Sequence, residues 1–147
     1  LRRATSNLFL TLMVTFLLAG CHSIYNIGAS KRNNQFDKTS NAYRIYIRWG
    51  EYEKAEAFIK MREGTPSNLD LDHLNQIHVT SYDVINEYVS LDEEKLPKEI
   101  VEDVEIEFYP ESSLTVKNLR HQQVWWYDVA EERWYLDTDL PDFRPAD

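Results

Sequence analysis

The chain has 147 residues, with 16 basic and 25 acidic side chains and a formal net charge of −9. This length fits one domain with a real core. The acidic balance argues against nucleic acid as a partner and against electrostatic adhesion to anionic lipid. A single cysteine excludes a disulfide within the chain.

The first twenty residues have the pattern of a signal peptide. Arg2 and Arg3 form a positively charged first segment, and a mostly apolar stretch follows from Leu8 to Ala19. That stretch is shorter than the ~20 residues of a membrane-spanning helix. Cleavage or anchoring is therefore favoured over a transmembrane segment.

The segment Leu18-Ala19-Gly20-Cys21 closes this stretch and resembles the lipobox of bacterial lipoproteins. The alternative is an ordinary secretory signal with an incidental cysteine. The resemblance implies that residues 1–20 are removed and that the thiol of Cys21 takes a diacylglycerol group. Because His22 rather than aspartate follows the cysteine, it also implies an anchor in the outer membrane, with the domain on the periplasmic side.

Residues 21–40 are mostly polar, which predicts a flexible tether that carries the lipid. A helix is predicted to begin at Ser40 or Asn41. Gly50 lies inside the pattern, so two helical segments and one straight helix are both open. The alternation in residues 44–48 leaves a short strand as another interpretation. The expected buried stripe, spaced by three or four residues, is Ala42, Ile45, Trp49, Tyr52, Ala55 and Ile59.

Four strands are predicted in the second half of the chain, where β-branched and aromatic residues alternate with polar ones. The segment Ile77 to Leu91 is predicted to be a strand or a bulged strand, because its alternation slips midway. In the next strand Val104, Ile106 and Phe108 share one face and acidic residues share the other. The predicted strands span residues 77–91, 100–109, 114–127 and 133–137.

This element order predicts one α+β domain over residues 41–147, with an N-terminal helix packed on a four-stranded antiparallel sheet. The order resembles the cystatin-like and nuclear-transport-factor-2-like folds. Isomerases of the second group place an aspartate and a tyrosine inside the cone of the sheet. The resemblance would give that role to Tyr82-Asp83 or Tyr127-Asp128, but nothing in the spacing selects either pair.

No metal site, cofactor or catalytic residue is predicted. The pairs Asp70/Asp72 and Asp137/Asp139 supply too few oxygen ligands for calcium. The four histidines are scattered and lack the spacing that zinc needs. Glycine-rich phosphate loops and the nucleophile-elbow motif are absent from the sequence.

Aromatic residues are dense near the C-terminus, where Trp125, Trp126, Tyr127, Trp134 and Tyr135 fall close together. Alternate residues of a strand point to opposite faces, so one set should pack on the helix. The other set should be covered by the C-terminal tail, a partner or a ligand. Trp125, Tyr127 and Tyr135 are the candidate binding surface, with core packing as the alternative interpretation.

The segments Trp49-Gly50-Glu51-Tyr52-Glu53, Trp125-Trp126-Tyr127 and Trp134-Tyr135-Leu136-Asp137 resemble those of a set of small proteobacterial lipoproteins, a resemblance that implies no activity. Our leading hypothesis is a lipid-anchored, non-catalytic periplasmic module. It would bind an envelope protein or a cell-wall component. The alternative is a small-molecule or enzymatic site inside the sheet.

Overall fold

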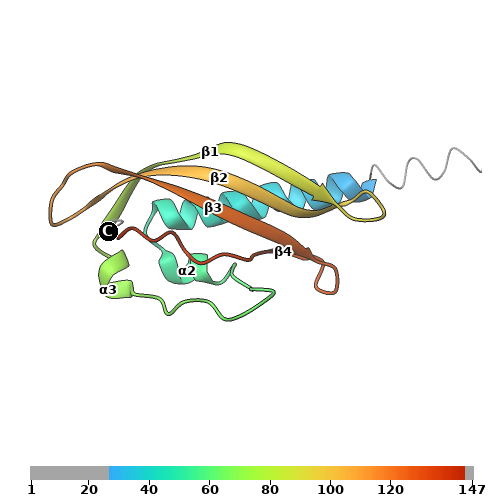
Figure 1. Cartoon of the computed structure of the whole chain (residues 1–147), viewed down its shortest axis with the longest axis horizontal. Coiled ribbons are helices and arrows are strands. Elements are labelled where there is room, and N and C mark those ends of the chain that lie inside the picture. The colour runs from blue at the N-terminus through green and yellow to red at the C-terminus, as the bar shows by residue number, and fades with distance from the viewer. Residues whose placement is uncertain (1–26, 145–147) are drawn as a thin grey trace, which may run out of the picture.

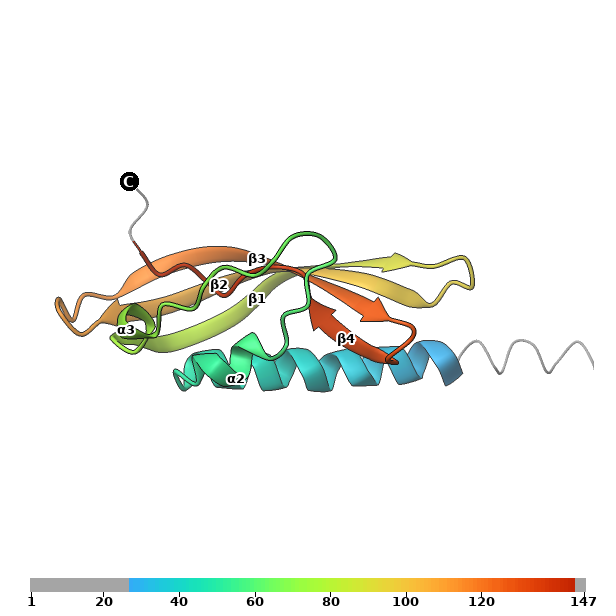
Figure 2. The ribbon, with the colours of Figure 1, turned by 90° about the horizontal axis from the view of Figure 1, so that it is seen from below.

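The computed structural model describes residues 27–144 and shows an α+β domain. A long helix over residues 27–48 lies along one face of a four-stranded antiparallel sheet (Figures 1 and 2). The strands are β1 (Ile77–Leu91), β2 (Pro97–Pro110), β3 (Lys117–Asp128) and β4 (Arg133–Leu136), in the order β1-β2-β3-β4. The predicted fold class and all four strands are confirmed.

The helix begins well before the predicted position. Residues 27–40 are helical, and Phe36 is buried in the core. The tether prediction is therefore wrong for residues 27–40, and residues 21–26 lie outside the described part of the chain. Polar composition misled the prediction because this helix is exposed on most of its circumference and needs few apolar residues.

The buried stripe of this helix also differs from the predicted one. Phe36, Tyr43 and Ile47 face the sheet and are buried, whereas Ile45 and Trp49 are exposed. Apolar side chains stand on several faces between residues 42 and 49, so the local sequence is compatible with more than one stripe. The stripe that continues back to Phe36 at helical spacing is the one that packs.

Gly50 ends the long helix. Its φ is +69°, a left-handed conformation that glycine adopts without strain. The amide of Glu51 donates to Tyr46 O (2.8 Å) and that of Gly50 to Ile47 O (3.2 Å), the hydrogen-bond pair of a Schellman cap. A second helix, α2 (Tyr52–Glu56), follows. Of the two helical interpretations, the one with two segments is confirmed, and the short strand over residues 44–48 is wrong.

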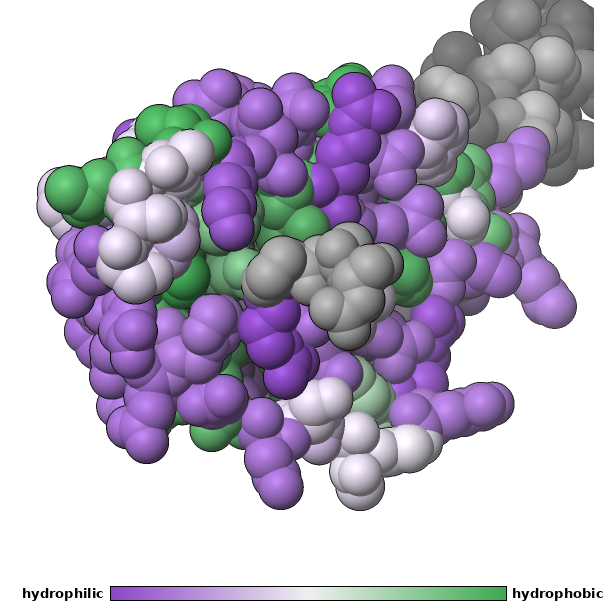
Figure 3. Space-filling model, turned by 60° about the vertical axis from the view of Figure 1, so that its left-hand side comes forward, coloured by the Kyte–Doolittle hydropathy of each residue, from purple (hydrophilic) through white to green (hydrophobic). Residues whose placement is uncertain are grey.

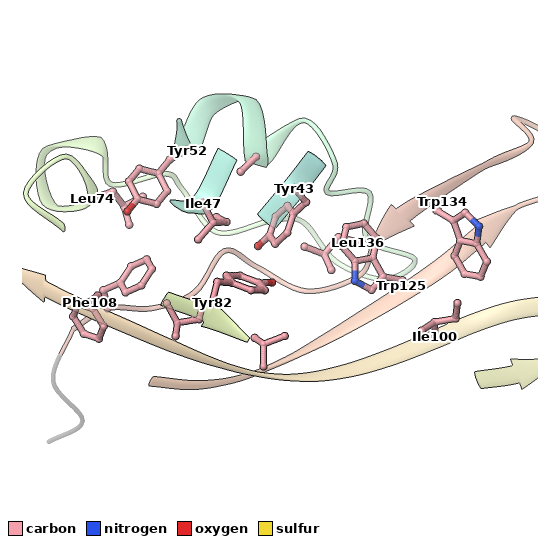
Figure 4. Packing of buried hydrophobic residues seen from close by; sticks show 14 of the residues in the cluster. Tyr43, Ile47, Tyr52, Leu74, Tyr82, Ile100, Phe108, Trp125, Trp134 and Leu136 are labelled. Atoms are coloured by element: carbon pink, nitrogen blue, oxygen red, sulfur yellow. The ribbon is translucent and has the colours of Figure 1, made fainter. Parts of the chain in front are cut away.

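The core lies between the helices and the inner face of the sheet. Tyr43 and Ile47 of the long helix and Tyr52 of α2 point toward Tyr82, Phe108 and Trp125 of the sheet (Figure 4). The inner face of β2 is buried at Ile100, Val104, Ile106 and Phe108, as its alternation predicts. Aromatic edges meet faces here, and the Tyr43 and Trp125 rings are 5.5 Å apart at 86°.

The remaining segments cover the ends and the β4 edge of the sheet. After α2 the chain runs along β4, where Ile59 forms a parallel bridge with Leu136, and then reaches α3 (Leu71–Leu74). The C-terminal segment returns across the sheet and buries Phe143 against Phe108, with the ring centroids 4.9 Å apart. The end of the molecule with α3 and the β2–β3 connection is mostly hydrophilic, with separate hydrophobic spots (Figure 3).

Candidate functional site: the β1 edge and its grooves

The predicted aromatic surface is part of the core. Trp125 is 0% exposed and Tyr127 is buried, both on the sheet face that meets the long helix. The Trp125 ring packs edge-on against Phe36, with centroids 6.0 Å apart. The prediction that Trp125 and Tyr127 belong to a binding surface is therefore wrong, and the alternative of core packing is the one observed. Strand alternation could not distinguish the two, because it assigns faces without saying which face is covered.

Tyr135 is buried on the opposite face of the sheet, where Trp126 is half-buried. The Trp126 indole donates to Lys60 O at 2.8 Å, and the Lys60 ammonium lies 4.8 Å from the Tyr135 ring centroid. The same ammonium pairs with Asp128 (2.7 Å) and Glu131 (2.5 Å), and these hydrogen bonds hold the pKa values of both carboxyls below their usual range. The chain after α2 thus covers the outer aromatic set, in place of the tail, partner or ligand that we expected.

The two side chains of each aspartate–tyrosine pair suggested by the isomerase resemblance do not lie together inside the sheet. Tyr82 points into the core, and the neighbouring Asp83 is exposed. Tyr127 is likewise buried, and Asp128 is bound by Lys60. In each pair the two side chains lie on opposite faces of the sheet, so neither pair acts as a unit inside it.

The most exposed apolar surface of the sheet lies on β1, the first edge strand. Beyond Tyr82 the strand is exposed on both faces, with 39 to 58% of each large apolar side chain accessible to solvent. These side chains are Val84, Ile85, Tyr88, Val89 and Leu91. Single exposed apolar residues are ordinary, but a contiguous set on an edge strand marks a surface suited to an interaction.

Two open grooves separate β1 from the long helix. One holds about 370 Å³ and has Phe36, Val89, Leu91 and Ile100 among its lining residues. The other holds about 360 Å³ near the end of the helix, where Trp49 is 78% exposed. We call β1 together with these two grooves the β1 edge. The long helix covers the middle of the sheet, so both faces of the second half of β1 remain accessible.

The β1 edge is acidic. The stretch from residue 78 to residue 94 contains no lysine or arginine, and its five carboxylates are Asp83, Glu87, Asp92, Glu93 and Glu94. Two of them stand directly opposite another carboxylate of β2, in the pairs Asp83↔Glu105 and Glu87↔Glu102. Like charges placed opposite each other are destabilising, so a cation brought to this edge would relieve repulsion.

Glu102 lies at the inner side of the edge and is 5% exposed. Burial raises the pKa of its carboxyl to about 7, and the nearby Glu87 adds to the rise. The Trp125 indole donates to its Oε2 at 3.1 Å and opposes the rise. Near it the Gln123 amide donates to the Tyr82 hydroxyl, and burial raises the pKa values of Tyr82 and Tyr43.

Neither a metal cluster nor a spanning helix is found within residues 27–144. No three histidine, cysteine, aspartate or glutamate side chains in this range are grouped to hold a metal ion. No helix in the same range is long and apolar enough to cross a membrane. The predicted lipidation residue Cys21 and its flanking residues Leu18, Ala19 and Gly20 precede this range.

Sequence reasoning missed the β1 edge as a site. Its signal was present in the sequence as Val84-Ile85 and Tyr88-Val89, pairs of large apolar neighbours that must point to both faces of a strand. The slip predicts a bulge, and the β1–β2 register shifts at three places, between Val79 and Ser81, Val84 and Asn86, and Ser90 and Leu91. That the strand is uncovered depends on where the helix lies, which local sequence does not encode.

Comparison of the chain with protein-family models gave no match, and comparison with curated proteins gave no match either.

Proposed function

We propose that this protein is a bacterial lipoprotein, anchored through Cys21, whose domain is a non-catalytic module that binds an envelope protein or a cell-wall component through the β1 edge. The anchor rests on the resemblance of Leu18-Ala19-Gly20-Cys21 to a lipobox, behind a charged and then apolar leader. Since His22 follows the cysteine, the expected address is the periplasmic face of the outer membrane.

The start of the long helix sets how far such a domain stands from the lipid. Six residue steps separate Cys21 from Ile27, which span at most about 20 Å when fully extended. The β1–β2 turn lies at this end, where the Leu96 side chain lies next to Gly28 and Arg32 pairs with Asp92 at 2.8 Å. In the proposed orientation the turn is nearest the leaflet, and the β1 edge runs away from it toward possible partners.

The observation that carries the binding role is the uncovered second half of β1. A fold that buries its core on the helix side gains nothing from five large apolar side chains on an edge strand. An exposed tryptophan borders the same strand at its other end, and tryptophan is enriched among residues that dominate binding energy. The β1 edge therefore has the composition of an interaction surface.

Mass spectrometry of the mature N-terminus tests the anchor. We expect a peptide that begins at Cys21 and carries acyl groups, and we expect Cys21→Ser to leave the precursor unlipidated, because an alcohol is a poorer nucleophile than a thiolate. Fractionation of the wild-type protein should then place it in the outer membrane. An unmodified mature peptide that begins at another residue would overturn the anchor, and recovery in the inner membrane would overturn the address.

Site-specific photo-crosslinking in intact cells tests the binding surface. A photoreactive residue at Tyr88 or Leu91 should give a discrete adduct with one envelope component, and the same residue at exposed Glu53 of α2 should not. Glu53 is a matched control because it is exposed and lines neither groove of the β1 edge. Equal adducts from all three positions, or none from β1, would contradict the proposed surface.

A small-molecule or enzymatic site inside the sheet is the second candidate, and the buried Glu102 is the observation that favours it. A carboxyl with a pKa of about 7 is suited to proton transfer near neutral pH. However, Tyr43, Ile47 and Trp125 fill the space between helix and sheet (Figure 4). A ligand that shifts the fluorescence of Trp125 and loses affinity in Glu102→Gln would favour this candidate over the β1 edge.

A further inference from the structure

We infer that β1 accepts a basic, extended segment of its partner, which adds to the sheet as a fifth strand. The inference rests on the proposed binding function and names the chemistry of the partner. It follows from three features of the β1 edge: free backbone groups, a groove for apolar side chains, and an excess of negative charge.

The backbone of β1 has one partner strand among the described residues. β2 pairs with it from Ile77 to Leu91, and the other side of β1 carries no paired strand within residues 27–144. Alternate residues of an edge strand direct their N–H and C=O groups away from the sheet. Bulges interrupt β1 near Thr80 and Ile85 but leave a regular register from Asn86 to Ser90. That stretch is long enough to template a short added strand.

Side chains of an added strand would point alternately to the two faces of the sheet. On the inner face they would reach the groove between β1 and the long helix, where Val89, Leu91 and Pro97 offer apolar contacts. On the outer face they would lie beside Asp83 and Asn86, near Asp103 and Glu105 of β2. The geometry suits a segment with apolar residues on one side and cationic residues on the other.

Charge decides between a basic partner and a second copy of this chain. Two copies paired through β1 would bring their carboxylates together without a lysine or arginine between residues 78 and 94. Edge strands commonly carry lysine as protection against pairing, and β1 has none. Three bases lie near the edge: Lys95 of the turn, Arg32, which is paired with Asp92, and Arg120 of β3, which is paired with Glu105. A basic segment would relieve the repulsion that a second copy would increase.

Synthetic peptides titrated against the full chain in detergent micelles test this inference. The probe is a short peptide that alternates lysine and valine. The first control replaces each lysine by glutamate, and the second keeps every side chain but N-methylates alternate backbone amides. We expect saturable binding of the parent peptide, no binding of the acidic one, and a loss of about tenfold or more on N-methylation, because two or three backbone hydrogen bonds are lost.

Chain variants locate the contact. Asp83→Asn should weaken binding of the lysine peptide by about two- to fivefold at low salt, since it removes one exposed carboxylate from the outer face, where the lysines would lie. The matched variant Glu53→Gln should leave affinity unchanged, and amide exchange on the peptide-bound protein should slow between residues 86 and 90. Equal affinity of the parent and N-methylated peptides would overturn strand addition.

The outcomes for the two proposals are separable. If Tyr88 and Leu91 crosslink to an envelope component in cells but the lysine peptide does not bind, the β1 edge is a binding surface and the basic strand is wrong. If the purified chain sediments as a dimer that Glu87→Lys strengthens, a second copy occupies the edge and the inference is also wrong. If β1 neither crosslinks nor binds peptide, both proposals fail.

Discussion

The two edges of this sheet differ in whether another described segment covers them. At the β4 edge, Lys60 N donates to Leu136 O (3.0 Å) and Leu136 N donates to Phe58 O (2.8 Å), so the segment after α2 satisfies the strand's outward backbone groups. Leu136 is 0% exposed there. At the β1 edge, Leu91 is 49% exposed, and no described segment lies beside the strand.

The difference shows that in this fold a separate segment protects an edge strand, and the residues of the strand itself do not. β4 has four residues, three of them buried, and would be an exposed hydrophobic edge without residues 58–60. β1 has fifteen residues and no such cover from residues 27–144, although bulges and charges limit its pairing. The binding role that we propose for β1 would explain why the described part of the chain closes the other edge and leaves this one open.

The largest expected effect is at the closed edge. Trp134→Ala should cost about 3 to 5 kcal/mol of unfolding free energy, the usual range for deleting a buried large aromatic side chain. Its ring packs on Phe36 at 5.3 Å, and its indole donates to Arg32 O at 2.9 Å. Tyr88→Ala on β1 should cost less than about 1 kcal/mol. Urea denaturation followed by circular dichroism measures both, and equal costs would contradict the contrast between the edges.

A matched pair of leucines tests the contrast with one chemistry. Leu136→Ala should cost about 2 to 5 kcal/mol, because it opens a cavity beneath the segment that closes β4. Leu91→Ala removes the same atoms from a half-exposed position and should cost about 1 kcal/mol or less. Denaturation midpoints at constant slope give the two values. If Leu91→Ala lowered the free energy of unfolding as much as Leu136→Ala, some segment would have to cover β1 in the folded protein.

Glu102, on the β1 side of the sheet, makes the free energy of unfolding depend on pH. Its pKa in the folded protein is about 7, against an ordinary value of 4.5. Between these two values the folded state keeps a proton that the unfolded state has lost, so this group's contribution to stability falls as the pH rises, and it levels off above pH 7. The shift corresponds to about 3 kcal/mol, as an order of magnitude.

Glu102→Gln should therefore stabilise the protein by up to about 3 kcal/mol at pH 8 and have little effect at pH 4, while an amide oxygen still accepts the Trp125 hydrogen bond. Other carboxyls titrate in the same range, so the measured quantity is the difference between variant and wild-type unfolding free energies at each pH. The exposed variant Glu93→Gln is the control. A difference that does not change with pH would show that folding leaves the pKa of Glu102 unchanged.

The smallest expected effect is at Trp49, beside the first half of β1. Trp49→Ala should change the unfolding free energy by less than about 0.5 kcal/mol, since the side chain is mostly exposed. The same substitution should reduce crosslinking or partner capture if the groove next to it belongs to the binding surface. A cost of several kcal/mol would restore our sequence prediction that this tryptophan is buried.

Local patterns in the sequence determined the sheet. The bounds predicted for the first strand, residues 77–91, coincide with β1, and the alternation of Val104, Ile106 and Phe108 gave the buried face of β2. Gly50 was recognised as the point where helical structure changes. These features follow from side-chain periodicity and from the backbone freedom of single residues, which are properties of neighbours in sequence.

Only the tertiary structure decided what is covered. Phe36 belongs to the core because Trp125 and Trp134, about a hundred residues away, pack against it. Tyr135 is buried because Lys60 and its segment cross the outer face. Sequence assigned both sets of aromatic residues to opposite faces of the sheet but could not say which would be buried, since burial depends on where distant segments pack. For the same reason, the sequence specifies the apolar surface of β1 while only the packed fold leaves it open.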